Sequence, residues 1–225
     1  MSNDLPYLKC LSGSTLKAIA VISMTIDHVA LYVMAGHLDK QDLWPYDVLR
    51  EVGRLAFPVF AFLVVEGYHH TRNLKRYVMN LLLTALVSEI PWFLLGQYDS
   101  HNVLFTLLLG LVGVILTDRI SQKSWLLSVP SFIIGLIATW INTDYSWHGI
   151  GLMVVFYLFR DKQFLIFPFG LPFLLEYGII GTSMGIIACL CYNGSRGFAR
   201  GRWPKFFFYI YYPLHLTIIL LWFKN

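Results

Sequence analysis

Six ionisable side chains lie within apolar stretches of this 225-residue sequence, where burying a charge costs free energy. They are Asp27, His28, Arg54, Glu66, Glu89 and His215. A histidine beside a carboxylate can accept a proton near neutral pH, and an arginine can neutralise a buried carboxylate. These residue types therefore indicate proton transfer, or binding of a charged group, between apolar elements.

The elements that must position these groups are apolar helices. Hydrophobic residues make up 57% of the chain, charged residues only 13%, and the mean hydropathy is +0.61. Apolar runs near the length of a membrane span fall at 16–35, 53–69, 77–95, 102–118, 125–141, 147–159, 163–175, 178–192 and 206–223. The sequence predicts an all-α, polytopic transmembrane helical bundle of about nine spans, forming a single domain over residues 1–225.

Two of these runs, 147–159 and 163–175, are short for a span. We expect them to form a helical hairpin that turns at Arg160-Asp161-Lys162. The first run carries Asp27 and His28 in its middle, so we expect a retained helix rather than a cleaved signal.

The positive charges predict an orientation. With the N-terminus in the cytoplasm, thirteen of the 17 Lys and Arg residues fall on the inner side, as the positive-inside rule requires. We therefore expect the N-terminus inside, the C-terminus outside, and an acid-rich outer loop before residue 53. Because topology accounts for the positive charges, we expect no nucleic-acid partner. The three cysteines have no metal-ligand partners at zinc spacing, so we also expect no metal.

This orientation sorts the polar groups into two layers. The central to outer layer contains Asp27, His28, Arg54, Glu89, Asn102, His148 and His215. The layer toward the cytoplasm contains Glu66, His69, His70 and Arg72. Each buried group has a packing interpretation too, in which it only closes an interhelical hydrogen bond or pairs with Arg54.

The partner of His28 must come from another helix, because neighbours in a helix project about 100° apart. Glu89, Asp27 on a differently rotated face and Tyr212 are candidates, and the sequence does not choose among them. A second polar segment, residues 193–205, places Arg196, Arg200, Arg202 and Lys205 among three glycines. It is either a topogenic loop or a cradle for phosphate oxygens.

An ordered series of motifs resembles the TraX family. It comprises Ile26-Asp27-His28, Gly53-Arg54-Leu-Ala-Phe-Pro58, Val65-Glu66-Gly67, His70-Thr71-Arg72-Asn73, Ser88-Glu89-Ile90-Pro91, the stretch Asn102 to Gly110, and Tyr212-Pro213-Leu214-His215-Leu216. The series extends over most of the chain.

The resemblance implies an acetyltransferase of the bacterial inner membrane that uses cytoplasmic acetyl-CoA, since the family's namesake is associated with acetylating the N-terminus of conjugative pilin. The acceptor would be an amine or hydroxyl of a pilin peptide or of an envelope glycan or lipid. His28 or His215 would act as general base or carry the acetyl group, Glu89 or Asp27 would orient the histidine, and Arg54 would compensate a carboxylate.

The same hypothesis assigns the other polar residues to substrates. The acetyl-CoA phosphates would lie near Arg72, Arg76, Arg196, Arg200 and Arg202 at the inner mouth, and Glu66, Asn102 and Tyr212 would contact the substrates. A secondary transporter that uses the buried Asp, Glu, His and Arg as a relay is the main alternative, and a non-catalytic assembly protein is the third. No inverted repeat of the transporter kind is visible.

Overall fold

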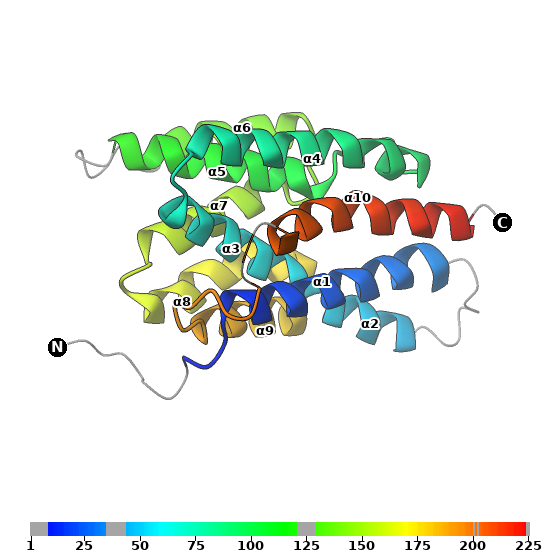
Figure 1. The fold of residues 1–225 in the computed structure, drawn as a ribbon, viewed down its shortest axis with the longest axis horizontal. Helices are drawn as coiled ribbons and strands as arrows, with labels where there is room; N and C mark the ends of the chain where they lie inside the picture. The colour runs from blue at the N-terminus through cyan, green and yellow to red at the C-terminus, as the bar shows by residue number, and fades with distance from the viewer. Residues whose placement is uncertain (1–8, 35–43, 121–128, 200, 202, 224–225) are drawn as a thin grey trace.

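The computed structural model describes residues 9–34, 44–120, 129–199, 201 and 203–223, and within these ranges regular structure is helical, with two isolated β-bridges. The longer helices are α1 (Gly13–Val29), α3 (Ala56–His70), α4 (Leu74–Leu94), α5 (Val103–Ile120), α7 (Ser146–Leu158) and α10 (Trp203–Phe223). Shorter ones are α2 (Trp44–Arg54), α6 (Val129–Trp140), α8 (Ile166–Gly170) and α9 (Ile179–Leu190). All-α structure is thus confirmed for the described residues, and Figure 1 shows these helices running roughly along one axis.

The helix α1 begins at a capped N-terminus and ends in a π-helical turn. Ser12 accepts a hydrogen bond from the Thr15 amide at 3.2 Å, as N-cap residues do. The amides of Gly13 and Ser14 donate to the carbonyls of Ser195 and Arg196, at 2.8 Å and 3.0 Å. Directly after His28 and Val29 the chain continues as a π-helix, Ala30–Met34, a distortion that is frequent at functional sites.

The region expected as an outer loop before residue 53 contains a helix, α2, so that part of the prediction is wrong. Its polar residues recur on one face, at Asp47, Arg50, Glu51 and Arg54, with spacings of three and four. The adjacent apolar stripe, which consists of Trp44, Val48 and Val52, is exposed by 77%, 41% and 42%. The mean hydropathy of such a helix is low, because its charged residues offset its apolar ones in the average, so a search for apolar runs does not find it.

The predicted short hairpin has a broken second arm. After α7 the chain turns at residues 159–162, where the Lys162 amide donates to the Phe159 carbonyl at 2.9 Å. The segment that follows consists of a 3₁₀ turn (Gln163–Leu165), α8, and a second 3₁₀ segment (Leu171–Tyr177). Pro168 and Pro172 remove amide donors there, which explains why no long helix forms.

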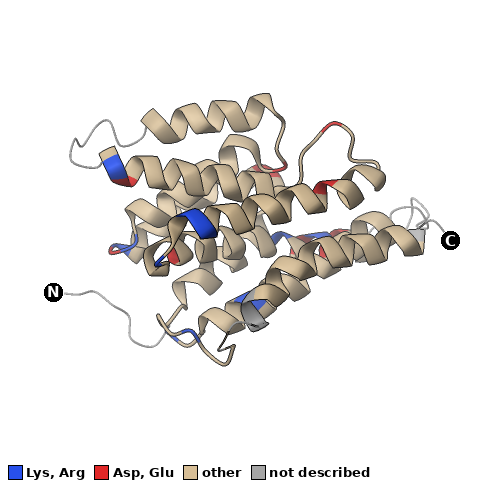
Figure 2. Cartoon of the chain, turned by 45° about the horizontal axis from the view of Figure 1, so that its top comes forward, with Lys and Arg blue, Asp and Glu red and all other residues tan. Residues whose placement is uncertain are grey.

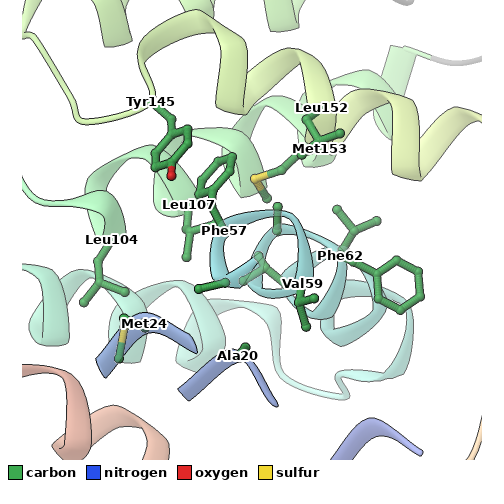
Figure 3. Packing of buried hydrophobic residues seen from close by; sticks show 14 of the residues in the cluster. Ala20, Met24, Phe57, Val59, Phe62, Leu104, Leu107, Tyr145, Leu152 and Met153 are labelled. Carbon is green, nitrogen blue, oxygen red and sulfur yellow. The ribbon is translucent and has the colours of Figure 1, made fainter. Parts of the chain in front are cut away.

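The centre of the molecule is α3, which packs against α1, α5, α7 and α9. Phe57, Val59 and Phe62 from α3 form much of the core shown in Figure 3, with Leu107 and Met153 from α5 and α7 against them. Glycines permit the closest approaches. A Cβ on Gly181 of α9 would lie 1.8 Å from the Glu51 carbonyl oxygen, so α9 contacts the backbone of α2 directly.

The outer surface of the bundle is apolar. On α10 the exposed residues Phe207, Ile210, Leu214, Ile218 and Leu221 recur every three or four positions and form one stripe. Figure 2 shows few charged residues along the helices. Within the described ranges, three helical segments are long and apolar enough to cross a membrane by length and composition, Gly13–Met34, Leu74–Leu94 and Val103–Ile120.

The polar residues gather at two ends of the bundle. The histidine end comprises the C-terminal part of α1, α2, and the connections 95–102 and 141–145. The arginine end comprises the start of α1, the end of α3, and residues 159–162 and 191–197. The two predicted layers of polar groups correspond to these two ends.

Candidate functional site

A histidine pair joins α1 to α10 at the histidine end. Nδ1 of His28 lies 2.7 Å from Nε2 of His215, and both side chains are buried. Nδ1 of His215 lies 3.0 Å from the carbonyl oxygen of Tyr211. The partner of His28 is therefore His215, which was not among the three candidates from sequence.

The hydrogen-bond chain fixes the tautomers of the neutral pair. A carbonyl only accepts, so Nδ1 of His215 carries the proton and donates it to Tyr211. Nε2 of His215 must then accept from Nδ1–H of His28. The remaining nitrogen, Nε2 of His28, consequently keeps its lone pair, which is the form that a general base or a nucleophile requires.

Two tyrosines flank the pair. The ring centroids of Tyr32 and Tyr212 lie 5.9 Å and 6.3 Å from that of His28, both edge-on. Tyr212, predicted as a substrate contact, is 4% exposed and also lies edge-on to His215. The two rings restrict the imidazole of His28 to one orientation, which suits a site that must present a single nitrogen.

Asp27 faces α2 and is neutralised there by Arg50. Nη1 of Arg50 donates to Oδ2 of Asp27 at 2.6 Å, whereas the other oxygen, Oδ1, is buried without a hydrogen-bond partner among the described residues. A Cβ on Gly53 would lie 2.2 Å from Oδ1, so this glycine leaves the room that the carboxylate occupies. Asp27 does not orient His28 through a hydrogen bond, which corrects the role predicted for it.

Arg54 points toward the connection between α6 and α7. It hydrogen-bonds to the hydroxyl of Tyr145 and interacts electrostatically with Asp27 and Asp144. The Tyr145 ring stacks on Phe57, with centroids 3.6 Å apart, and Figure 3 shows the two rings together. Arg54 thus stays close to Asp27, as expected, but shares it with Arg50.

Asp144, in the connection to α7, was missed in the sequence. Asp144 is exposed at the surface, but protein packed around its carboxylate desolvates it, and this desolvation raises the pKa of Asp144 to about 6 despite the nearby Arg54. The Asp144 carboxylate also interacts electrostatically with the hydroxyl groups of Tyr32, Tyr177 and Tyr212. Asp144 lies in the five-residue connection 141–145 between α6 and α7, and its position in a short polar connection between two apolar runs could have indicated it from the sequence.

A hollow of about 400 Å³ opens beside these groups. The polar face of α2 forms one wall, and Glu176, Tyr177 and Gly178 form the other. Glu51 closes its base, since Oε2 accepts the Gly181 amide at 2.9 Å and caps the N-terminus of α9. His148, predicted at an outer helix mouth, lies 3.7 Å from Glu176. The hollow therefore presents both charge signs to a ligand.

Glu89 does not reach the histidine pair, so its predicted role in orienting His28 is wrong. Oε1 of Glu89 accepts from Nδ1 of His101 at 2.5 Å, and Oε2 accepts from Nδ2 of Asn102 at 2.5 Å. Asn102 is fully buried and its Oδ1 accepts the Leu104 amide at 3.1 Å at the start of α5. Asn102 consequently holds the carboxylate and the helix terminus, and the carboxylate orients His101.

Glu66 lies at the arginine end, far from the histidine pair. Its Oε1 accepts from Nε of Arg160 at 2.9 Å, and Nε2 of His70 lies 3.3 Å from Oε2. The Glu66 side chain is 10% exposed and that of Arg160 41%. Pairing with Arg54, the packing alternative, does not occur, and this ion pair instead ties α3 to the turn after α7.

We expect Arg160→Ala to destabilise the fold more than Glu66→Gln does. Removing the arginine leaves a nearly buried carboxylate with only His70 beside it, which costs about 1–3 kcal/mol after allowance for solvent at Arg160. Thermal unfolding in detergent measures the loss, and the double variant Arg160→Ala/Glu66→Gln should recover most of it. Lys162→Ala, which removes an exposed cation two residues away, is the control; equal losses in all variants would contradict the pairing.

The predicted phosphate-binding arginines lie partly in the described residues. Arg72, Arg76 and Arg196 are exposed at the arginine end, whereas Arg200 and Arg202 lie outside the described residues. The segment carrying Arg196 is packed on the start of α1, since a Cβ on Gly197, at φ +79°, would lie 2.1 Å from Oγ of both Ser12 and Ser14. Exposed arginine forks suit phosphate groups.

Among the described residues, no group of three or more His, Cys, Asp and Glu side chains is placed to hold a metal ion. Over the residues that the structure describes, fold and site define an all-helical protein that has three helical segments long and apolar enough to cross a membrane and a buried histidine pair beside charged residues. The chain belongs to the TraX family, because the family model described as TraX protein matches residues 12–222.

Two curated relatives were found. A protein of Dichelobacter nodosus, described as "probable fimbrial assembly protein FimC, serogroup H1", is 28% identical over 239 residues, covering 92% of this chain and 94% of that protein. The uncharacterised protein RP591 of Rickettsia prowazekii is 28% identical over 153 residues, covering 66% of this chain and 56% of that protein. No solved structure matches the chain.

Proposed function

We propose that the protein is an integral membrane acetyltransferase that moves an acetyl group from cytoplasmic acetyl-CoA to an amine or hydroxyl acceptor. The observation that carries the proposal is the hydrogen-bond chain from Tyr211 through His215 to His28, which leaves a lone pair on Nε2 of His28. Such a nitrogen, buried beside cationic residues, is arranged for general-base catalysis.

The residues divide the chemistry among them. Nε2 of His28 takes the proton from the acceptor nitrogen or oxygen as that atom bonds to the acetyl carbonyl carbon. His215 stabilises the resulting imidazolium by accepting from Nδ1 of His28. Arg54, close to the site and held by Tyr145, supplies positive charge for the oxyanion that develops. Acetyl-CoA supplies the activated acyl group; the bond between its carbonyl carbon and sulfur breaks, and the imidazolium of His28 gives the proton to the departing thiolate, which leaves as CoA thiol.

A bilayer explains the arrangement of polar and apolar faces. On α2 the charged residues Arg50, Glu51 and Arg54 contact other parts of the protein, whereas the apolar stripe of Trp44, Val48 and Val52 is exposed, the reverse of a helix on a water-soluble protein. Together with the charge asymmetry, this supports a multi-pass protein of the bacterial inner membrane, with about nine spans and the arginine end in the cytoplasm.

The arginine end would receive the donor. Ser14, whose amide binds the Arg196 carbonyl, precedes His28 by 14 residues, which is about 21 Å along a helix at about 1.5 Å per residue. If Arg72, Arg76 and Arg196 bind the phosphates, the flexible arm of acetyl-CoA would therefore extend over this distance through the bundle toward His28. The family, and the fimbrial assembly relative, favour a pilin peptide or an envelope glycan or lipid as acceptor, in pilus assembly or conjugation.

We expect the triple variant Arg72→Gln/Arg76→Gln/Arg196→Gln to raise the KM for acetyl-CoA about 10- to 100-fold, because two or three charge-assisted phosphate contacts are lost. The kcat should change little, since these residues lie away from His28. Initial rates against acetyl-CoA concentration measure both constants. Arg119→Gln, another exposed arginine near a helix end, is the control, and an unchanged KM in the triple variant would return these residues to a topogenic role.

Sealed vesicles test the proposal against a transporter. We expect CoA thiol to be released when acetyl-CoA and a primary amine or an alcohol are supplied on their respective sides. Uptake of a substrate without CoA release, lost in the His28→Ala variant, would favour the transporter and reject the acetyltransferase.

A further inference from the structure

A groove of about 550 Å³ lies between the outer face of α4 and the connection to α5. Ile90, Phe93 and Leu94 form its largely apolar wall, and Glu89, Gln97 and His101 lie at its polar side. Its floor is fixed, because Nε1 of Trp92 donates to the Ser100 carbonyl at 2.8 Å. The volume is that of a site for a small organic ligand.

The apolar wall continues the exposed stripe of α4. Ile90 and Phe93 are exposed by 65% and 52%, and Leu83, Leu86 and Val87 continue the exposed surface toward the start of the helix. On a membrane-spanning helix such a surface faces lipid chains. A ligand would therefore reach the groove sideways from the bilayer, with an apolar chain lying along α4.

The polar end of the groove is a carboxylate–histidine pair. Both oxygens of Glu89 are engaged, by His101 and Asn102, so the carboxylate fixes Nδ1 of His101 as the protonated nitrogen. The backbone of His101 is anchored too: its amide donates to the Asn142 carbonyl and its carbonyl accepts the Asp144 amide, each at 3.0 Å. In the neutral imidazole, Nε2 of His101 is thus an acceptor for an N–H or O–H group of a ligand.

The groove also adjoins the histidine pair. The Gln97 side chain lies beside the Tyr32 hydroxyl, and the Tyr32 ring is 5.9 Å from that of His28. One polar residue of the groove and one tyrosine therefore separate its polar side from His28. A head group bound by His101 would lie at the edge of the proposed catalytic site.

We propose that this groove binds a single-chain amphiphile from the bilayer, with its chain on Ile90, Phe93 and Leu94 and its hydrogen-donating head group on the Glu89–His101 pair. Resting on the proposed function, the groove is the lateral entrance through which a membrane-borne acceptor approaches His28. Its binding chemistry, however, requires no acetyl transfer.

Photolabelling in phosphatidylcholine nanodiscs tests the apolar wall. The probe is dodecylamine with a diazirine in its chain, and mass spectrometry locates the labelled peptide. We expect labelling of residues 89–101 in the native protein and a loss of about tenfold in Ile90→Trp, which fills the groove. Leu94→Trp should repeat the loss. Val87→Trp, equally exposed on α4 but outside the groove, should label normally; equal labelling of all variants would overturn the proposal.

The head group is tested with His101→Ala and a second probe, the methyl ether of the same chain, which has no donor. The amine probe should label the native protein about tenfold more than the ether does, and His101→Ala should abolish that preference. Equal labelling by both probes would reject the histidine contact. If the probes label the groove as expected but no acetyl transfer is found, only the proposed function is rejected. If acetyl transfer is found but labelling does not depend on the variant or the probe, only the proposed binding groove is rejected.

Discussion

Replacing His28 by alanine is expected to lower the kcat for acetyl transfer by about 10²- to 10⁴-fold, the usual contribution of a general base. The reason is the tautomer of His28. Because His215 donates to the Tyr211 carbonyl and accepts from Nδ1 of His28, the other nitrogen, Nε2 of His28, keeps its lone pair. Release of CoA thiol with a saturating acceptor amine measures the rate. The KM for acetyl-CoA should hardly move, since the arginines that would bind it lie at the other end.

His215→Ala separates catalysis from packing. Without its acceptor, Nδ1 of His28 loses the bond that selects its tautomer, so we expect a smaller fall, about 10- to 100-fold, in kcat. His70→Ala, which alters an exposed histidine at the arginine end, is the matched control and should keep the native rate. The thermal midpoints of all three variants show whether they are folded. Normal turnover by a folded His28→Ala protein would remove His28 from the mechanism.

The second large effect concerns the contact between α9 and α2. Gly181→Ala places a Cβ where the Glu51 carbonyl oxygen lies 1.8 Å away and Cβ of Arg54 2.9 Å away. Backbone cannot yield as a flexible side chain does, so α9 must move outward and strand the Glu51 carboxylate that caps it. We expect a loss of about 3 kcal/mol, the upper part of the usual range for overpacking.

Gly113→Ala is the control for this substitution. It also lies within a helix, but its new Cβ would be 3.4 Å from the nearest atom, Oγ of Ser131, an ordinary contact. Thermal unfolding in detergent should show a clear drop in the midpoint for Gly181→Ala and little change for Gly113→Ala. Similar midpoints for the two variants would mean that α9 does not pack on α2 as described.

Apolar run length predicted the positions of most helices, because it follows directly from what each segment must bury. It failed at α2, where the apolar stripe of Trp44, Val48 and Val52 alternates with charges. Average hydropathy responds to the sum of the two faces, whereas the period of three to four residues carries the information.

Residue type identified buried ionisable groups but could not assign their partners. Glu89 was one of the candidates for orienting His28, yet its carboxylate binds His101 and Asn102 instead. His101 lies at a predicted helix end near water, where a polar residue costs little, so its residue type gave no sign of this partnership. The helix rotation that decides such contacts depends on packing, including the close approach of Gly53 to Asp27, which no single-chain pattern reports.

The membrane acetyltransferase claim is tested most directly by incubating the purified protein, in nanodiscs, with acetyl-CoA labelled in its acetyl group and a soluble primary amine or alcohol. We predict that the label appears on the acceptor with one CoA thiol released for each acetyl group transferred, and that His28→Ala suppresses both together. Acetyl-CoA that remains intact with the folded native protein, across both acceptor classes, would contradict the claim.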